Sequence, residues 1–198
     1  MIEHTPWVGS AYEQGLDGQK IAIVGYSHWL SDGEPDSPNV TIDVISRVVS
    51  GEYDDIAFFR LVREYFGNDD ASEFWKKVMF MNFVPEAIGT GDDRYESASG
   101  PDQIRGQQRF LKLMKEHSPD KILVFTTKGW TQLPRLREES PPGKAKPLGA
   151  EFPAMSWGTY EGDLRPMMAF GLRHSQFARG EMMRRAVRFI MDMAPVEI

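Results

Sequence analysis

Four short apolar runs, each followed at once by polar side chains, are the most regular feature of this sequence. The polar clusters that end them are Tyr26-Ser27-His28-Trp29, Asn82-Phe83, Thr126-Thr127-Lys128 and Arg173-His174-Ser175. Helix-length stretches separate the runs, which predicts strands that alternate with helices. In open parallel α/β sheets the carboxyl ends of the strands line the ligand crevice. We therefore expect the four clusters to meet at one polar site.

The strands are predicted at residues 20–25, 78–81, 121–125 and 166–172, and residues 157–160 are predicted to form a hairpin with the last of them. Helices are predicted from about residue 39 or 41 to 50, and over 54–66, 101–117 and 178–193. Long loops are expected at 31–38, 85–100 and 134–153. This order predicts one α/β domain over residues 1–198, with three layers (α/β/α) and a central, mostly parallel sheet of four strands.

Composition narrows the class of protein. Apolar residues make up 41% and charged residues 26%, as in ordinary folded domains. The net charge of -6 argues against a protein that grips duplex nucleic acid through a broad basic face. The absence of cysteine excludes disulfides, thiolate metal sites and a cysteine nucleophile. Since neither a secretion signal nor a membrane-length apolar stretch is present, we expect a cytoplasmic monomer with no membrane partner.

Several common site motifs are absent from the strand exits. Without GxGxxG, GxxxxGK[ST] or GxSxG, the sequence gives no support to dinucleotide binding, a phosphate-binding loop or an α/β-hydrolase nucleophile. The histidines, His4, His28, His117 and His174, are widely separated and form no HxH or HxxxH pair. We therefore expect neither a metal nor a cofactor.

Two polar residues at strand ends are candidates for ligand contact. His174 precedes a predicted helix start, where its ring could donate to an oxygen and the helix N-terminus favours negative charge. A helix cap or a satisfied core imidazole would explain it equally well. The planar amide of Asn82 suits the edge of a pyrimidine-like ring, although an Asn here could also form a turn.

The remaining candidates each have a structural alternative as well. Phe83 could stack on a ring or fill the core. Ser27 and His28 are neighbours, but adjacent side chains usually diverge, so a serine nucleophile with this base is weakly supported. Thr127 and Lys128 could hold phosphate, or could simply begin a helix.

Taken together, the four strand exits resemble the uracil-DNA glycosylase superfamily over roughly residues 20–192, by the order and spacing of motifs. Residues 25–29 are similar to the family's Gly-Gln-Asp-Pro-Tyr motif, and VMFMN looks like the strand whose Asn reads the uracil edge. ILVFTTKGW resembles the strand that enters a Trp-Gly or Gly-Lys turn. His174-Ser175-Gln176 is similar to the His-Pro-Ser segment that stabilises the leaving base and enters the minor groove.

The resemblance implies a role for each matching residue. The implied catalytic residues are His174, Ser27 and His28; the implied base-binding residues are Asn82, Phe83, Trp29, Gly25 and Tyr26; the implied backbone or phosphate contacts are Ser175, Lys128 and Thr127. The partner would be DNA or a nucleotide. The sequence departs from the family in three places: Ser27 replaces the Asp that positions water, Ser175 replaces Pro, and Trp29 replaces the Tyr that excludes the thymine methyl. The lack of cysteine excludes the iron-sulfur branches.

Three functions follow from these observations. The resemblance implies a divergent glycosylase of DNA repair, which binds a nucleobase and hydrolyses the N-glycosidic bond of a damaged base. The missing carboxylate also permits a non-catalytic nucleotide or nucleic-acid binding module on the same fold. A hydrolase of small esters or amides that uses Ser27 with His174 ranks last, since no acidic partner for a triad is recognisable.

Overall fold

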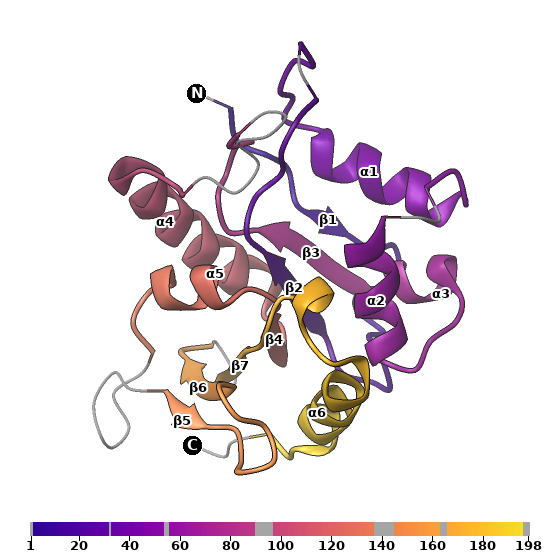
Figure 1. Cartoon of the computed structure of the whole chain (residues 1–198), viewed down its shortest axis with the longest axis vertical. Helices are drawn as coiled ribbons and strands as arrows, with labels where there is room; N and C mark the ends of the chain where they lie inside the picture. Colours follow the sequence, from indigo (N-terminus) through magenta and orange to yellow (C-terminus); the bar gives the residue numbers. More distant parts are fainter. Residues whose placement is uncertain are drawn as a thin grey trace.

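The computed structural model describes residues 2–31, 33–53, 56–89, 97–136, 145–162 and 166–195. Within these residues, seven strands form one mixed sheet in the order β1-β3-β2-β4-β7-β6-β5 (Figure 1). Its parallel centre comprises β3 (Val78–Asn82), β2 (Ile21–Gly25), β4 (Lys121–Val124) and β7 (Met167–Gly171). The antiparallel edges are β1 (Trp7–Val8) on one side, and β6 (Ser156–Tyr160) followed by β5 (Lys146–Pro147) on the other.

The α/β class is confirmed, and the prediction of a four-stranded sheet is wrong. The four predicted strands form the parallel centre, and β6 and β7 form the predicted hairpin. The extra strands are β1, β5 and β6, of which β1 and β5 are two residues long. So short a strand carries no alternation of apolar and polar residues that a sequence could reveal.

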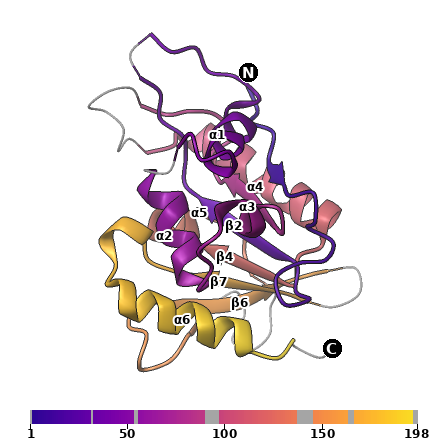
Figure 2. The ribbon, with the colours of Figure 1, turned by 90° about the vertical axis from the view of Figure 1, so that its right-hand side faces the viewer.

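Helices cover both faces of the sheet. On one face lie α1 (Val40–Val49), α2 (Ala57–Tyr65), α3 (Ala71–Trp75) and α6 (Gly180–Asp192), and Figure 2 looks onto this face. On the other face lie α4 (Gly100–His117) and α5 (Thr127–Gln132). The 3-10 turn η2 (Ser175–Phe177) joins β7 to α6. Parts of the predicted helix at 54–66 and of the predicted loops, namely residues 54–55, 90–96 and 137–144, lie outside the described residues.

The central strands are apolar without interruption because both of their faces are covered. In β2, Ile21 and Ile23 join the core under α1, α2, α3 and α6, whereas Ala22 and Val24 join the core under α4. Side chains therefore alternate between the two cores along each strand. This alternation extends one residue beyond β2 and β3, where the rings of Tyr26 and Phe83 pack in the core under α4.

Among the described residues, no helix is long and apolar enough to cross a bilayer.

Candidate functional site

The exits of β2 and β3 run side by side beyond the ends of the strands. The amide of Phe83 donates to the carbonyl of Gly25 at 3.0 Å, and the amide of Val84 donates to the carbonyl of Tyr26 at 2.8 Å. Further out, the amide of Ile88 donates to the carbonyl of His28 at 3.1 Å. These bonds extend the strand pairing into the loops. They give the side chains of both exits a fixed relative position.

A cavity of about 330 Å³ lies at these exits, on the face of the sheet covered by α1 and α2. Its described lining residues are Gly25, Tyr26, Ser27, His28, Trp29, Val44, Ile56, Phe58, Phe59, Phe80, Asn82, His174 and Gln176. Residues far apart in sequence, such as Ser27, Asn82 and His174, thus meet at one cavity. None of the described lining residues is an Asp, Glu, Lys or Arg, so this described part of the wall carries no permanent charge.

Asn82 is the most buried polar side chain of this wall, with 5% of its surface exposed. Its backbone carbonyl accepts a hydrogen bond from Arg109 Nη1 at 2.9 Å. Its carboxamide lies over Gly25, where a Cβ would come within 2.2 Å of Asn82 Oδ1. Within the described residues, no protein group hydrogen bonds to this carboxamide. Its amide atoms are not sealed in the core and open into the cavity, where water or a ligand can pair with them.

The apolar part of the wall is aromatic and centres on Phe58 of α2. The centroid of its ring lies 5.8 Å from that of Phe80 and 5.8 Å from that of His174. It therefore spans the gap between the β3 exit, where Asn82 sits, and the η2 turn. Aromatic rings beside a polar amide can hold a flat ring by stacking while the amide reads its edge.

His174 caps the η2 turn. Its Nδ1 accepts a hydrogen bond from the backbone amide of Gln176 at 3.3 Å. Burial lowers the pKa of His174, so the ring is neutral at pH 7. A neutral imidazole that accepts at Nδ1 carries its proton on Nε2 and can donate from there. The turn is held in place by Tyr65, whose hydroxyl donates to the carbonyl of Ser175 at 2.8 Å.

His28 is the second imidazole of the wall. Its Nε2 lies 2.9 Å from Thr41 Oγ1 of α1. Burial, and after it the neighbouring His4, lowers the pKa of His28 from 6.5 to about 4. The ring is therefore neutral at pH 7 as well. Behind it, the ring of His4 makes an edge contact at a centroid distance of 5.3 Å.

The rings of two predicted base-binding residues, Phe83 and Tyr26, pack on the other face of the sheet, although Tyr26 also lines the cavity. Phe83 is fully buried in the core on the other face of the sheet, where its ring packs against Gly106 of α4. The hydroxyl of Tyr26 donates to Gln132 Oε1 at 3.2 Å and accepts from the amide of Ala98 at 3.0 Å, so this ring also faces the α4 side. Alternation along the strand explains both ring positions, because each residue follows one that faces the cavity. Phe83 fills the core and cannot stack on a ligand there.

The predicted backbone or phosphate contacts do not line this cavity either. Thr126 begins α5, and its side chain accepts from the amide of Gly129 at 3.1 Å, which matches the capping alternative. Thr127 is exposed, and Lys128 Nζ lies 4.7 Å from the centroid of the Tyr26 ring. Ser175 is the first residue of η2 and is buried. None of these residues is among the described lining residues.

Several residues of the site carry no motif in the sequence. Val44 and Ile56 complete the apolar wall with Phe58. Asp36 accepts a hydrogen bond at 2.7 Å from Nε2 of His4, which is itself fully buried. The sequence did offer one indication of this wall, the adjacent residues Phe58 and Phe59 in a predicted helix. Adjacent helix positions differ by about 100°, so only one of the two rings can face the core fully, and the other is left partly exposed.

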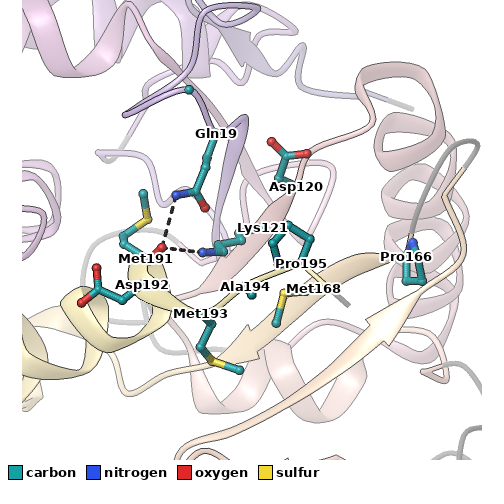
Figure 3. A pocket seen from close by; sticks show the side chains of 11 residues that line it. Gln19, Asp120, Lys121, Pro166, Met168, Met191, Asp192, Met193, Ala194 and Pro195 are labelled. Atoms are coloured by element: carbon teal, nitrogen blue, oxygen red, sulfur yellow. Dashed lines mark hydrogen bonds between the residues drawn. The ribbon is translucent and has the colours of Figure 1, made fainter. Parts of the chain in front are cut away.

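Two other cavities of similar size occur among the described residues. One, of about 340 Å³, lies at the amino end of the parallel strands (Figure 3). There Lys121 Nζ donates to the carbonyls of Ile190 and Met191, both at 2.7 Å, and Gln19 donates to Met191. These groups cap the carboxyl end of α6, where a cation is favourable, so their role is structural.

The other cavity, of about 400 Å³, lies between α2 and α6 and has a charged lining that includes Lys77, Arg184 and Asp192. Volume therefore does not distinguish the three cavities. The cavity at the strand exits differs from the others by its uncharged imidazoles, its aromatic wall and its unpaired amide. Among the described residues, no group of three or more His, Asp or Glu side chains is arranged to hold a metal ion.

Comparisons with known proteins gave no relative: no protein-family model matches the chain, and a search of curated proteins found no match. The resemblance to uracil-DNA glycosylases consequently depends on the four strand-end motifs alone.

Proposed function

We propose that this protein is a divergent uracil-DNA glycosylase-like protein that binds a nucleobase in the cavity at the strand exits and hydrolyses the N-glycosidic bond of a damaged base in DNA. The observation that carries the proposal is the carboxamide of Asn82. It is almost fully buried, faces the cavity and has no partner among the described residues. A nucleobase edge offers the donor and acceptor that this amide lacks.

The rest of the wall suits the same ligand. Phe58 provides an aromatic face close to His174, and the cavity volume of about 330 Å³ is at the lower end of the range for small-molecule sites, roughly 300–1,000 Å³. The uncharged side chains of the described lining suit an uncharged ring better than a phosphate. A base extruded from DNA costs a few kcal/mol in lost stacking, which contacts of this kind offset.

The reaction assigns complementary tasks to the two histidines. A water oxygen forms a bond to the sugar carbon that holds the base, the bond from that carbon to the base nitrogen breaks, and its electron pair leaves with the base. His174, which carries its proton on Nε2, donates a hydrogen bond to the departing anion. The proton of the water passes to His28, which is neutral at pH 7, and later to solvent or to the base.

A non-catalytic module that only binds a nucleobase or nucleotide is the second candidate. It is favoured by the absence of any carboxylate among the described lining residues. The serine-hydrolase alternative loses support, because His174 accepts at Nδ1 and so has no lone pair on Nε2 for a serine proton.

The test uses uracil-containing single- and double-stranded oligonucleotides, with abasic sites revealed by alkaline cleavage. We expect cleavage by the wild-type protein and a loss of roughly tenfold to a hundredfold in rate for Asn82→Ala, since a paired amide discriminates by about 1–3 kcal/mol. Asn39→Ala is the matched control, because Asn39 is exposed and its side chain makes no capping bond to α1. We expect Asn39→Ala to match the wild type.

Thermal stability with a panel of nucleobases and nucleotides separates the two candidates. Binding without cleavage would support the non-catalytic module, and a ligand at a hundredfold excess over its dissociation constant should stabilise the fold by about 2.7 kcal/mol. If the wild-type protein neither cleaves at enzyme excess nor is stabilised by any base, both candidates are wrong.

A further inference from the structure

Asp36 is a carboxylate that is hydrogen bonded to His4, the histidine whose ring contacts His28. Its Oδ1 accepts from His4 Nε2 at 2.7 Å and from the amide of Ser37 at 2.8 Å, and its Oδ2 accepts from the amide of Ala87 at 3.0 Å. Burial opposes its ionisation, but these hydrogen bonds outweigh burial and lower the pKa of Asp36. Asp36 is thus a fixed anion at neutral pH.

His4 connects this anion to the cavity wall. Its ring is fully buried, and its backbone is held on both sides: its amide donates to the carbonyl of Pro85 at 2.7 Å, and its carbonyl accepts from Arg109 Nη2. Nε2 is used by Asp36, and Nδ1 is buried without a partner. The ring edge meets His28 at a centroid distance of 5.3 Å and an interplanar angle of 66°.

His28 therefore lies between two fixed neighbours. Thr41 Oγ1 engages Nε2 at 2.9 Å, and the ring of His4 packs against the imidazole. If Nε2 donates to Thr41, the lone pair of His28 is on Nδ1. The charged or titratable groups that act on His28 in addition to His4 are Asp36 and Arg109, and His174 lies across the cavity.

We propose that His4 and Asp36 are positioning residues of this site: together they hold His28 with its proton on Nε2, and Asp36 balances the positive charge that His28 gains when Nδ1 accepts a proton from water. The inference rests on the proposed function. It gives the site the carboxylate that its described lining lacks: Asp36 acts through His4 at a distance, as the buried Asp of a catalytic triad acts through its histidine without being protonated itself.

The proton balance is simple. In the attack, an O–H bond of water breaks, its proton binds His28 Nδ1, and the oxygen bonds to the sugar carbon as the base leaves with its electron pair. His28 becomes a cation between His4 and Thr41, with the Asp36 anion behind His4. His4 and Arg109 both oppose this charge, which makes the Asp36 anion more important. No oxidant, metal or further reactant is needed.

Asp36→Asn is the primary test, with Asp43→Asn as the matched control. Asp43 is an exposed carboxylate in the first turn of α1, the helix that carries Thr41. We expect Asp36→Asn to slow base release about tenfold or more while nucleobase affinity changes by no more than about twofold, because a positioning group acts on the chemical step and not on ligand binding. Asp43→Asn should leave both quantities unchanged.

A second measurement does not depend on activity. Imidazole ¹⁵N shifts of the full-length protein at pH 7 report which nitrogen carries the proton, and His28→Gln identifies the His28 signals. We expect wild-type His28 to carry its proton on Nε2, and Asp36→Asn to give a mixture of the two tautomers. If Asp36→Asn folds poorly, His4→Gln, whose amide can still donate to Asp36, should give the same loss of rate and the same mixture.

The outcomes are distinct. Equal rates for the two Asp variants, or a wild-type His28 with its proton on Nδ1, would overturn the positioning role. A wild-type protein that releases no base would overturn the proposed hydrolysis and the catalytic task of His28, and the ¹⁵N shifts would still decide whether Asp36 and His4 orient His28.

Discussion

At the scale of single residues, the site depends on one close approach between two neighbouring strands. Gly25 and Asn82 are paired in the register of β2 and β3, and the carboxamide of Asn82 occupies the space where any other residue at position 25 would have its Cβ. Gly25 is therefore required because it leaves room for Asn82. Its backbone conformation does not require glycine, because its φ is not in the left-handed region. The sequence places Gly25 and Asn82 at strand ends, and only the register reveals that they touch.

Gly25→Ala should therefore displace the Asn82 carboxamide. The added Cβ would lie 2.2 Å from Asn82 Oδ1 and 3.3 Å from Phe80 Cζ, so the side chains must move or the strands must separate. We expect a loss of nucleobase affinity together with a destabilisation of about 1–3 kcal/mol, as for other overpacked cores. Calorimetric titration and urea denaturation measure the two effects.

Gly180→Ala is the control for that substitution. Gly180 begins α6, and a Cβ there would make only ordinary contacts, at 3.7 and 3.9 Å, with the end of the Arg184 side chain. Alanine also has the higher helix propensity, so the variant should be as stable as the wild type or slightly more stable. A Gly25→Ala protein that binds nucleobases normally would contradict the assignment of Asn82 as the residue that reads the ligand.

At the scale of elements, the pattern of apolar runs predicted the parallel centre of the sheet and the meeting of Ser27, Asn82 and His174 at one edge. The same pattern did not predict on which face of the sheet each side chain lies. Asn82 and Phe83 are adjacent, so period-two alternation alone sends the Phe83 ring to the opposite core, and this could have been read from the sequence. The contribution of α2 to the cavity wall could not have been read from the sequence, because it depends on how that helix packs above β3.

Phe58 of α2 is expected to take the stacking role first assigned to Phe83. Its ring contacts those of Phe59, Phe80, Phe125 and His174, yet it is only partly buried. Phe58→Leu keeps most of the apolar volume and removes the aromatic face. We expect nucleobase affinity to fall by about 1–3 kcal/mol, the usual worth of one stacked base, with little change in the urea midpoint.

Phe189→Leu is the matched control, since Phe189 is an exposed aromatic residue of α6 that packs on Phe152 away from the cavity. Fluorescence or calorimetric titration should give wild-type affinity for Phe189→Leu. Equal affinities for the two variants would mean that Phe58 does not touch the ligand.

At the scale of the whole molecule, the site is closed from behind by segments far apart in the chain. Arg109 of α4 joins the carbonyls of Asn82 and His4, and His4 in turn reaches Asp36. Burial lowers the pKa of Arg109 to about 10, so its guanidinium remains charged at pH 7. No sequence pattern marks these long-range contacts. They are made by isolated polar groups, which lie in a helix, in a loop and among the first residues of the chain. They tie the geometry of the cavity to the stability of the fold.

Because the cavity wall is part of the folded core, the titration of His28 should make the stability of the fold depend on pH. The pKa of His28 is about 4 in the folded protein and near 6.5 when the chain is unfolded. Below pH 6.5 the unfolded chain binds a proton that the folded protein does not bind until about pH 4, so the free energy of unfolding falls as the pH drops through this window. The loss from His28 alone reaches at most about 3 kcal/mol. Asp36, the hydrogen-bond partner of His4, contributes stability that is lost only below its ordinary pKa of 3.8.

Urea denaturation of the wild type and of His28→Gln between pH 7 and pH 4 measures the contribution of His28 to this pH dependence. Other groups, including His174 with its lowered pKa, titrate in both proteins and cancel in the difference. The wild type should lose up to about 3 kcal/mol more than the variant, and all of the excess should appear below pH 6.5, because above that pH His28 is neutral in both states. Parallel curves would mean that His28 is accessible to protons in the folded protein, and with it the cavity wall would lose the neutral imidazole that the proposed chemistry requires.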